Sequence, residues 1–325
     1  MSIRGRAVSS ACGIGTLLVG AVAFLSGCSD AAPRAHASVS QAAVSQAAAT
    51  TAPPASDDFG GPDALGPSTP KRIVSLNPTT TEILFAIGAG DRVVGRSEYD
   101  VFPTQATRVP NLGAALRPNV EAVVGAHPDL VILYASQDDR PAYDRLRQAG
   151  VATVAFRIDS IGQFERDTRL LGRMTGDSAE AATLVDTVSA TLARVRAATA
   201  ALPRPSVFMP AWQQPIIAIG GGSFLSELLE IAGARNVYAD IKAPSAPVAL
   251  EDVVRRNPDI VLATPVSAPM IRTEARWQAV GAVRRGRVLV FDTTLVSRPS
   301  VQLGAAARSL ADLIHPGVLP RGPTP

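Results

Sequence analysis

The chain has 325 residues, of which 46% are hydrophobic and 18% charged, and its formal net charge is +3. This length can hold two domains of ordinary size, and the composition is typical of a globular protein rather than a disordered one. The small net charge, with no cluster of Lys and Arg interleaved with aromatic residues, argues against a nucleic-acid partner.

The N-terminus has the layout of an export signal. Arg4 and Arg6 precede the apolar run 11–25, which is too short and too lightly flanked for a transmembrane helix. The run leads into LSGC, which ends at Cys28 and resembles the lipobox of bacterial lipoproteins. We therefore predict a lipoprotein signal peptide over residues 1–27 and lipidation of Cys28, whose acyl chains would hold the protein to a membrane. An ordinary signal peptide with an incidental cysteine is the alternative.

Removal of the signal would also discard the other cysteine, Cys12, so the exported domain would have no disulfide. Residues 28–70, after the signal, are rich in Ala, Ser, Thr, Pro and Gly and show no periodicity. Such a composition cannot bury a core, which predicts a disordered tether. Folding is expected to begin at Lys71.

Strand and helix patterns alternate over residues 71–160. Strands are predicted at 72–76, 92–96, 129–134 and 151–156, and helices from Thr79 onward, after Asn119, and over 138–150. Strands alternating with helices favour a parallel sheet with helical crossovers. This range is therefore predicted to be an N-terminal α/β lobe.

Residues 161–203 carry no strand signal. Apolar residues recur at helical spacing, and the second helical run, about 24 residues, would span about 36 Å as one continuous helix. Pro203 and Pro205 end it. We interpret the range as a helical segment containing one long backbone helix between two lobes.

The alternation resumes over residues 204–318, a C-terminal α/β lobe followed by a tail at 319–325. Strands are predicted at 206–209, 215–220, 236–239 and 288–292, with helices at 223–233, after Ala249, and over 300–314.

Two stretches of the chain repeat each other. NVEAVVGAHPDLVIL (119–133) and ALEDVVRRNPDIVLA (249–263) align at an offset of 130, which places Glu121 opposite Glu251. TEILFAIGAG (81–90) and SELLEIAGAR (226–235) align at an offset of 145. The repeats favour two similar lobes, although α/β sequences that merely resemble one another are the alternative.

Enzyme signatures are weak. The three histidines, His36, His127 and His315, show no metal-ligand spacing, and no nucleophile–base pair is recognisable. Gly220–Gly222 could cradle an anion, but a tight turn that glycine permits is the simpler interpretation. We therefore expect no enzymatic activity, no metal site and no cofactor.

Two lobes on a shared helix suggest a cleft, and ligand sites of α/β proteins gather at the carboxyl ends of strands. The candidate ligand contacts are polar or aromatic residues that follow predicted strands: Tyr99, Tyr134, Trp212, Gln213 and Arg298. Together they favour a flat, largely apolar ligand with one polar corner.

The stretches KRIVSLNPTTTEILFAIGAGDRVVG and EYDVFP, together with the two repeated segments, resemble the substrate-binding proteins of ABC importers for cobalamin, haem and ferric siderophores. The resemblance covers about residues 70–315. It implies two similar Rossmann-like lobes joined by one long rigid helix, with the ligand held in the cleft between them. It also implies an extracytoplasmic, lipid-anchored monomer that delivers a metal chelate, as cargo rather than cofactor, to an ABC permease driven by a separate ATPase.

The resemblance also assigns roles to residues. Glu121 and Glu251 match the glutamates with which cobalamin-binding members engage permease arginines; both would also be stabilising as acidic residues in a first helical turn. Tyr99 and Tyr134 match aromatic ligand contacts, and Arg298 matches an arginine near the ligand. Two family tryptophans are missing, with Asn111-Leu112-Gly113 in place of one and Ser245 near the place of the other.

We therefore predict capture of a cobalamin-type corrinoid. A haem or ferric-siderophore binder is the alternative within the family. An extracytoplasmic enzyme or ligand sensor on the same scaffold is the alternative from a different class.

Overall fold

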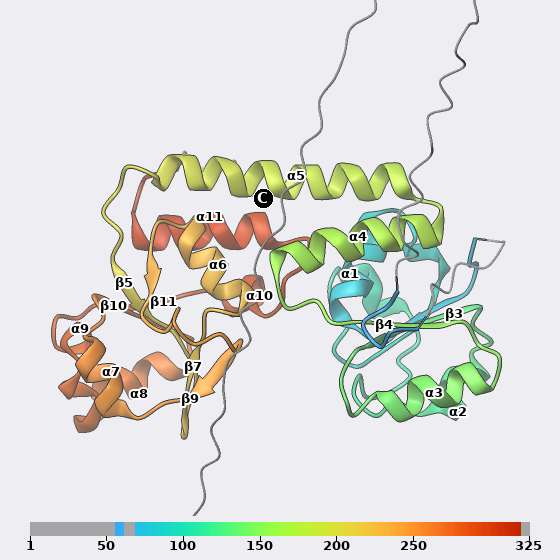
Figure 1. Ribbon diagram of the computed structural model, residues 1–325, viewed down its shortest axis with the longest axis horizontal. Coiled ribbons are helices and arrows are strands. Elements are labelled where there is room, and N and C mark those ends of the chain that lie inside the picture. Colours follow the sequence, from blue (N-terminus) through green and yellow to red (C-terminus); the bar gives the residue numbers. More distant parts are fainter. Residues whose placement is uncertain (1–55, 62–68, 320–325) are drawn as a thin grey trace, which may run out of the picture. The chain divides into compact units, whose positions relative to one another are not determined.

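The computed structural model describes residues 56–61 and 69–319 of the chain. The first lobe is built on a four-stranded parallel sheet in the order β2-β1-β3-β4 (Figure 1). Its strands are β1 (Ile73–Ser75), β2 (Val93–Arg96), β3 (Leu130–Tyr134) and β4 (Thr153–Phe156). β3 reads LVILY with four of its five residues buried, as expected of a parallel strand covered on both faces.

Short helices connect these strands. They are α1 (Pro78–Ala86), α2 (Val120–Gly125) and α3 (Arg140–Gln148), with 3-10 turns at Gly90–Arg92 and Thr104–Arg108. Asn77 caps α1 by accepting a hydrogen bond from the amide of Thr79, and Pro78 occupies the first helical turn, where its missing N–H costs nothing.

Two helices form the connection between the lobes. α4 (Ile161–Thr175) ends at Gly176, whose φ of 81° is the left-handed cap that glycine favours, and α5 (Ser178–Thr199) follows. One stripe of α5, from Ala181 through Val188 to Val195, is buried against α4 and against helices α6 (Phe224–Ile231) and α11 (Leu303–Ile314) of the second lobe. Figure 1 shows α5 running above both lobes.

The second lobe contains two sheets. A parallel sheet has the order β11-β10-β5-β8, and an antiparallel sheet has the order β6-β7-β9. The parallel strands are β5 (Ser206–Phe208), β8 (Arg235–Asn236), β10 (Ile260–Ala263) and β11 (Val288–Val290). The antiparallel strands are β6 (Pro210–Gln213), β7 (Ile216–Ile219) and β9 (Ser245–Pro247). The remaining helices are α7 (Leu250–Arg256), α8 (Ser267–Thr273), α9 (Gly281–Arg284) and α10 (Thr293–Val296), with a 3-10 turn at Ala275–Ala279.

A single hydrophobic cluster runs through both lobes. It joins Ile83 of α1 and Phe164 of α4 to Val188 of α5, and continues to Leu228 of α6 and Leu310 of α11, all of them buried. Since a close-packed core resists deformation, the shared cluster ties the lobes into one unit along the helices.

The structure confirms the predicted α/β class with parallel sheets, but it differs from the sequence prediction in the second lobe. The strand predicted at 215–220 is β7, which belongs to the antiparallel sheet, because only Gln214 and Pro215 connect it to β6. A two-residue connection can join antiparallel neighbours only. Strand β8 ends at Asn236 rather than residue 239, and β9 was not predicted, since SAP has no apolar pattern.

A second difference lies in the tether predicted over residues 28–70. Residues 57–61 are held against the first lobe: the amide of Asp58 donates to the carbonyl oxygen of Ala155 at 3.0 Å, and Asp57 is 5% exposed. Polar residues in this stretch make specific contacts that composition does not reveal. The predicted signal peptide, the lipidation site Cys28, the first part of the tether and nearly all of the tail lie outside the described residues.

Within the described ranges, no helix combines the length and hydropathy needed to cross a bilayer. In the same part of the chain, His, Cys, Asp and Glu side chains do not gather in groups of three or more that could hold a metal ion.

Candidate functional site

A cavity of about 570 Å³ lies between the two lobes. The first lobe contributes the N-terminus of α1, the end of β3 and the segment after β4; the second lobe contributes the N-terminus of α6, the start of β9 and the segment after α10. Its lining is Asn77, Pro78, Thr79, Tyr134, Arg157, Ile158, Asp159, Ser223, Phe224, Pro244, Ser245, Ser297, Arg298 and Pro299. The cavity thus occupies the interdomain position where ligands of α/β proteins gather.

Asp159 organises the wall that the first lobe contributes. Its carboxylate accepts hydrogen bonds from the hydroxyl of Tyr134 at 3.1 Å and from Nε of Arg157 at 2.8 Å. Its backbone oxygen accepts from the amide of Phe224 at 3.1 Å, which links the wall to the second lobe. Burial, followed by the negative charge of Asp159, raises the pKa of Tyr134, so its hydroxyl remains a hydrogen-bond donor at neutral pH.

Arg298 reaches across from the second lobe. Its Nε donates to Oε1 of Glu82 on α1 at 2.6 Å, and Glu82 is 1% exposed. The other oxygen of Glu82, Oε2, is buried without a hydrogen-bond partner. Arg298 therefore lines the cavity, but its Nε is bonded to a buried carboxylate, so its terminal nitrogens are the ones that could contact a ligand.

Glu227, which the sequence repeat aligns with Glu82, also makes a contact outside its own lobe. Its Oε1 accepts a hydrogen bond from the amide of Ile161, the first residue of α4, at 3.4 Å, and burial raises its pKa. The two repeated helices, α1 and α6, thus each send a glutamate toward the other half of the molecule.

The remaining predicted contacts lie outside the cavity. Tyr99 and Trp212 are each 59% exposed, and Trp212 donates its indole N–H to the backbone oxygen of Gln214 at 2.9 Å. Trp212 and Gln213 come after β5, but they themselves belong to the next strand, β6. The structure therefore brings Tyr134 and Arg298 together at one cavity, but not Tyr99, Trp212 or Gln213 with them.

Tyr99 is presented by a loop that a buried carboxylate holds. Asp100 is fully buried and accepts hydrogen bonds from the amide of Ser97 at 2.9 Å and from the hydroxyls of Ser97 and Thr81. Burial is the main cause of the raised pKa of Asp100, and these hydrogen bonds oppose it. The loop exposes Tyr99, Val101 and Phe102 in close succession.

Sequence reasoning missed Arg157, Asp159 and Ser223 as lining residues. A usable signal was present: Arg157 and Asp159 directly follow a predicted strand, and Ser223 follows the glycine-rich turn. That turn serves packing, since a Cβ atom at Gly222 would lie 2.1 Å from the backbone oxygen of Lys242.

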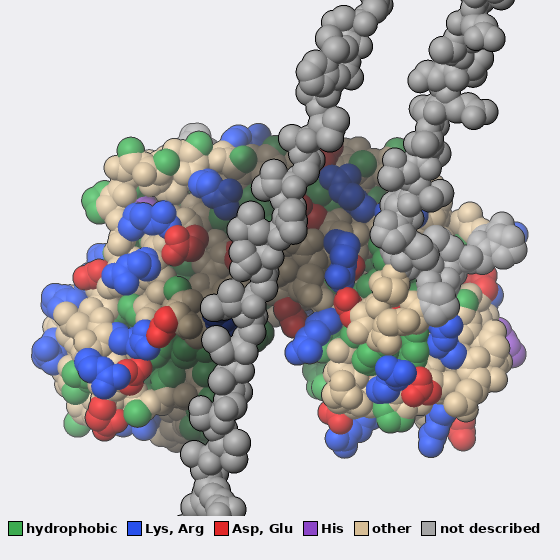
Figure 2. All heavy atoms as spheres, viewed as in Figure 1, with side chains coloured by type: hydrophobic (Ala, Val, Ile, Leu, Met, Phe, Trp, Pro, Cys, Tyr) green, Lys and Arg blue, Asp and Glu red, His purple; other side chains and the backbone are tan. Residues whose placement is uncertain are grey.

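Glu121 and Glu251 occupy matching positions in the two lobes. Both are exposed residues in the first turn of their helices, α2 and α7. Figure 1 places α2 and α7 on the side of the lobes away from α5. Figure 2, which has the orientation of Figure 1, shows Lys and Arg side chains intermixed with Asp and Glu side chains on the visible face of both lobes.

The chain is similar in sequence to known binding proteins. A model of the family described as periplasmic binding protein matches residues 73–295. An uncharacterized ABC transporter substrate-binding lipoprotein of Bacillus subtilis is 28% identical over 312 residues, covering 94% of this chain and 97% of the relative. A cobalamin-binding protein of Halobacterium salinarum is 32% identical over 266 residues, covering 76% of this chain and 70% of the relative.

Solved structures share the fold. The periplasmic vitamin B12 binding protein of Vibrio cholerae superposes with a TM-score of 0.67 at 23% identity, covering 75% of this chain and 96% of the other. A periplasmic heme binding protein from Pseudomonas aeruginosa superposes with a TM-score of 0.68 at 22% identity, covering 78% and 95%.

Proposed function

This chain belongs to the periplasmic binding protein family, and on that premise we propose that it is a lipid-anchored protein that captures a cobalamin-type corrinoid. The family consists of transport binding proteins of the ABC type, which work outside the cytoplasm with a permease and an ATPase. The observation that carries the proposal is the cavity of about 570 Å³ between the lobes, lined by Tyr134 and Arg298.

The volume and chemistry of the cavity suit one part of a large, flat ligand. Pockets for small molecules span about 300–1,000 Å³ and combine apolar walls with a few polar groups. Here Pro78, Ile158 and Phe224 supply apolar surface, and Arg157 and Arg298 supply hydrogen-bond donors.

The lining favours a corrinoid over haem. Haem iron needs an axial ligand from the protein, commonly His, Cys, Met or Tyr. Among the described residues that line the cavity, Tyr134 is the sole candidate. Its hydroxyl already donates to Asp159 at 3.1 Å, so it would have to give up this hydrogen bond to ligate iron. A corrinoid carries its metal already ligated and makes no such demand.

Delivery would use the two exposed glutamates. Glu121 and Glu251 lie on corresponding helices of the two lobes, so two basic groups on a permease could form one ion pair with each lobe. Interfacial charges of this kind fix register and speed the encounter more than they add affinity.

The ligand is tested by titrating the chain from residue 56 onward with cyanocobalamin, haemin and a ferric siderophore. The exposed Trp212 and the buried Trp277 supply the fluorescence signal. Cyanocobalamin is expected to bind at micromolar concentration or tighter. Binding of haemin or the siderophore without cyanocobalamin would replace the corrinoid by that ligand.

Docking is tested separately with the double variant Glu121→Ala, Glu251→Ala. We expect unchanged ligand affinity and loss of uptake in cells that depend on the transporter. The matched control is Glu180→Ala, which removes an exposed first-turn glutamate from α5 and should leave uptake intact. Weaker ligand binding by the double variant would contradict the docking role.

A further inference from the structure

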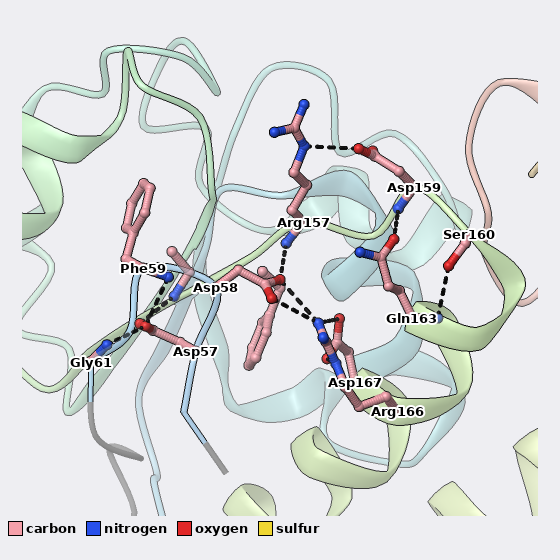
Figure 3. A network of polar contacts seen from close by, with 12 residues as sticks. Asp57, Asp58, Phe59, Gly61, Arg157, Asp159, Ser160, Gln163, Arg166 and Asp167 are labelled. Atoms are coloured by element: carbon pink, nitrogen blue, oxygen red, sulfur yellow. Dashed lines mark hydrogen bonds and ion pairs between the residues drawn. The ribbon is translucent and has the colours of Figure 1, made fainter. Parts of the chain in front are cut away.

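Residues 57–61, here called the strap, cover the free edge of the first sheet (Figure 3). β4 is the last strand of that sheet, and carboxylates of the strap accept hydrogen bonds from two amides at its end. The amide of Ala155 donates to Oδ2 of Asp57 at 3.1 Å, and the amide of Arg157, just after β4, donates to Oδ2 of Asp58 at 2.6 Å. An edge strand otherwise leaves such groups unpaired.

The strap is a specific structure. Oδ1 of Asp57 accepts hydrogen bonds from the amides of Phe59 at 3.1 Å and Gly61 at 2.8 Å, which folds the strap back on itself. The ring of Phe59 packs edge-on against Tyr143 with centroids 5.0 Å apart. A Cβ atom on Gly61 would lie 2.0 Å from the Tyr143 hydroxyl oxygen, so the close approach depends on glycine.

The strap also reaches α4. Nη2 of Arg166 lies 3.0 Å from both carboxylate oxygens of Asp58, while Nε of the same arginine donates to the buried Asp167 at 2.6 Å. Asp58 is therefore bonded at once to the end of β4 and to α4, the two elements on either side of residues 157–160.

Those bridged residues form part of the ligand cavity. Arg157 and Asp159 line it, and the carboxylate of Asp159 holds both Tyr134 and Arg157. The backbone oxygen of Asp159 accepts the hydrogen bond from Phe224 of the second lobe. The contacts thus run from the strap through Arg157 to the cavity wall and the junction between the lobes.

We propose that Asp58 is a positioning residue for the ligand cavity: by holding the amide of Arg157 and the side chain of Arg166, it sets the backbone that carries Asp159. A stretch outside the cavity, on the segment that would lead to the membrane anchor, thereby shapes the ligand site. The predicted effect on ligand affinity rests on the proposed function, whereas the effect on the junction between the lobes does not.

The first test needs no ligand. Amide hydrogen exchange is measured on the full chain and on Asp58→Ala, resolved at Arg157 and Phe224. The matched control is Asp186→Ala, which removes an exposed carboxylate that pairs with Arg169 of the same helix α4 at 3.2 Å. We expect exchange at both amides to rise about tenfold in Asp58→Ala and to stay unchanged in the control. Unchanged exchange at Phe224 would overturn the proposal, because a purely local role would disturb Arg157 alone.

The second test measures cyanocobalamin affinity. Asp58→Ala is expected to bind about tenfold more weakly, as loss of one hydrogen bond to a charged group would predict. Asp58→Asn keeps an oxygen that can accept from the Arg157 amide but gives up the ion pair with Arg166, so its affinity should lie between those of Asp58→Ala and the unsubstituted chain. Equal affinity of all three proteins, or an Asn variant as weak as the Ala variant, would overturn the positioning role. If the unsubstituted chain binds no cyanocobalamin, the proposed function fails, and exchange at Phe224 still decides the role of Asp58.

Discussion

Replacing Arg298 by methionine should destabilise the ligand-free protein strongly. Arg298 is the ion-pair partner of Glu82, whose side chain is fully buried at the junction of the lobes and whose Oε2 already lacks a partner. Removing one member of a buried pair leaves an uncompensated charge and costs about 3–5 kcal/mol. The Arg298 side chain is 25% exposed, which partly screens the pair, so we expect about 3 kcal/mol.

The assay is urea denaturation and a thermal scan of the chain from residue 56 onward. For a protein of this size, about 3 kcal/mol corresponds to a fall in Tm of roughly 6–12 °C. Adding Glu82→Gln to Arg298→Met removes the buried carboxylate that Arg298→Met leaves without its arginine. The double variant should recover most of the lost free energy of unfolding, because a buried neutral amide costs less than a buried carboxylate.

A surface pair provides the control. Arg276 binds Glu274 at 2.7 Å with both side chains more than a third exposed, so Arg276→Met should change the free energy of unfolding by about 0.5 kcal/mol or less. The reasoning is refuted if Arg298→Met is no less stable than Arg276→Met, or if the Glu82→Gln, Arg298→Met double variant is as unstable as the single one.

Three further predictions concern stability and use the same urea assay. Burial raises the pKa of Asp167 to about 6, so the native state binds the proton of this carboxyl group more tightly than the unfolded chain does. The free energy of unfolding should therefore fall by up to about 3 kcal/mol between pH 4 and pH 7. Asp167→Asn should remove this contribution to the pH dependence of the free energy of unfolding. An unchanged pH dependence would contradict the assignment. Gly222→Ala should lower the free energy of unfolding by about 2 kcal/mol or more, because the new Cβ atom would clash with the backbone oxygen of Lys242. Gly125→Ala on α2, where a new Cβ atom would meet no described atom beyond its own helix within 4 Å, should be neutral or stabilising. Trp277→Ala should lower the free energy of unfolding by about 3–5 kcal/mol, because the ring is fully buried. Trp277→Phe should lower it distinctly less, because the buried indole N–H has no hydrogen-bond partner to lose. Equal losses in the two variants would contradict this reasoning.

Much of the fold could be predicted because its signals are local. Parallel strands buried on both faces appear as short apolar runs such as LVILY, and the buried stripe of α5 recurs at helical spacing. The prediction failed where pairing depends on neighbours: β7 looks like a parallel strand until its two-residue connection to β6 is seen, and β9 has no apolar pattern at all.

The candidate site was less predictable. Tyr134 and Arg298 were predicted as ligand contacts because they follow strands or match a family position, and the structure places both in the cavity lining. The partner of Arg298 is Glu82, 216 residues away in the chain, and no periodicity links them. The contacts of the strap could not be predicted for the same reason. Asp58 and Arg157 are 99 residues apart, and the strap has the composition of a linker.

The sequence by itself determined the α/β class, the helical connection between the lobes and the matched positions of Glu121 and Glu251. Each of these depends on which face of a local element is buried, and residue type and spacing record that directly. The tertiary structure alone decided which polar groups meet: Arg298 with Glu82, Asp159 with Phe224, and Asp58 with Arg157. These contacts join residues that only the packing of whole elements brings within hydrogen-bond distance.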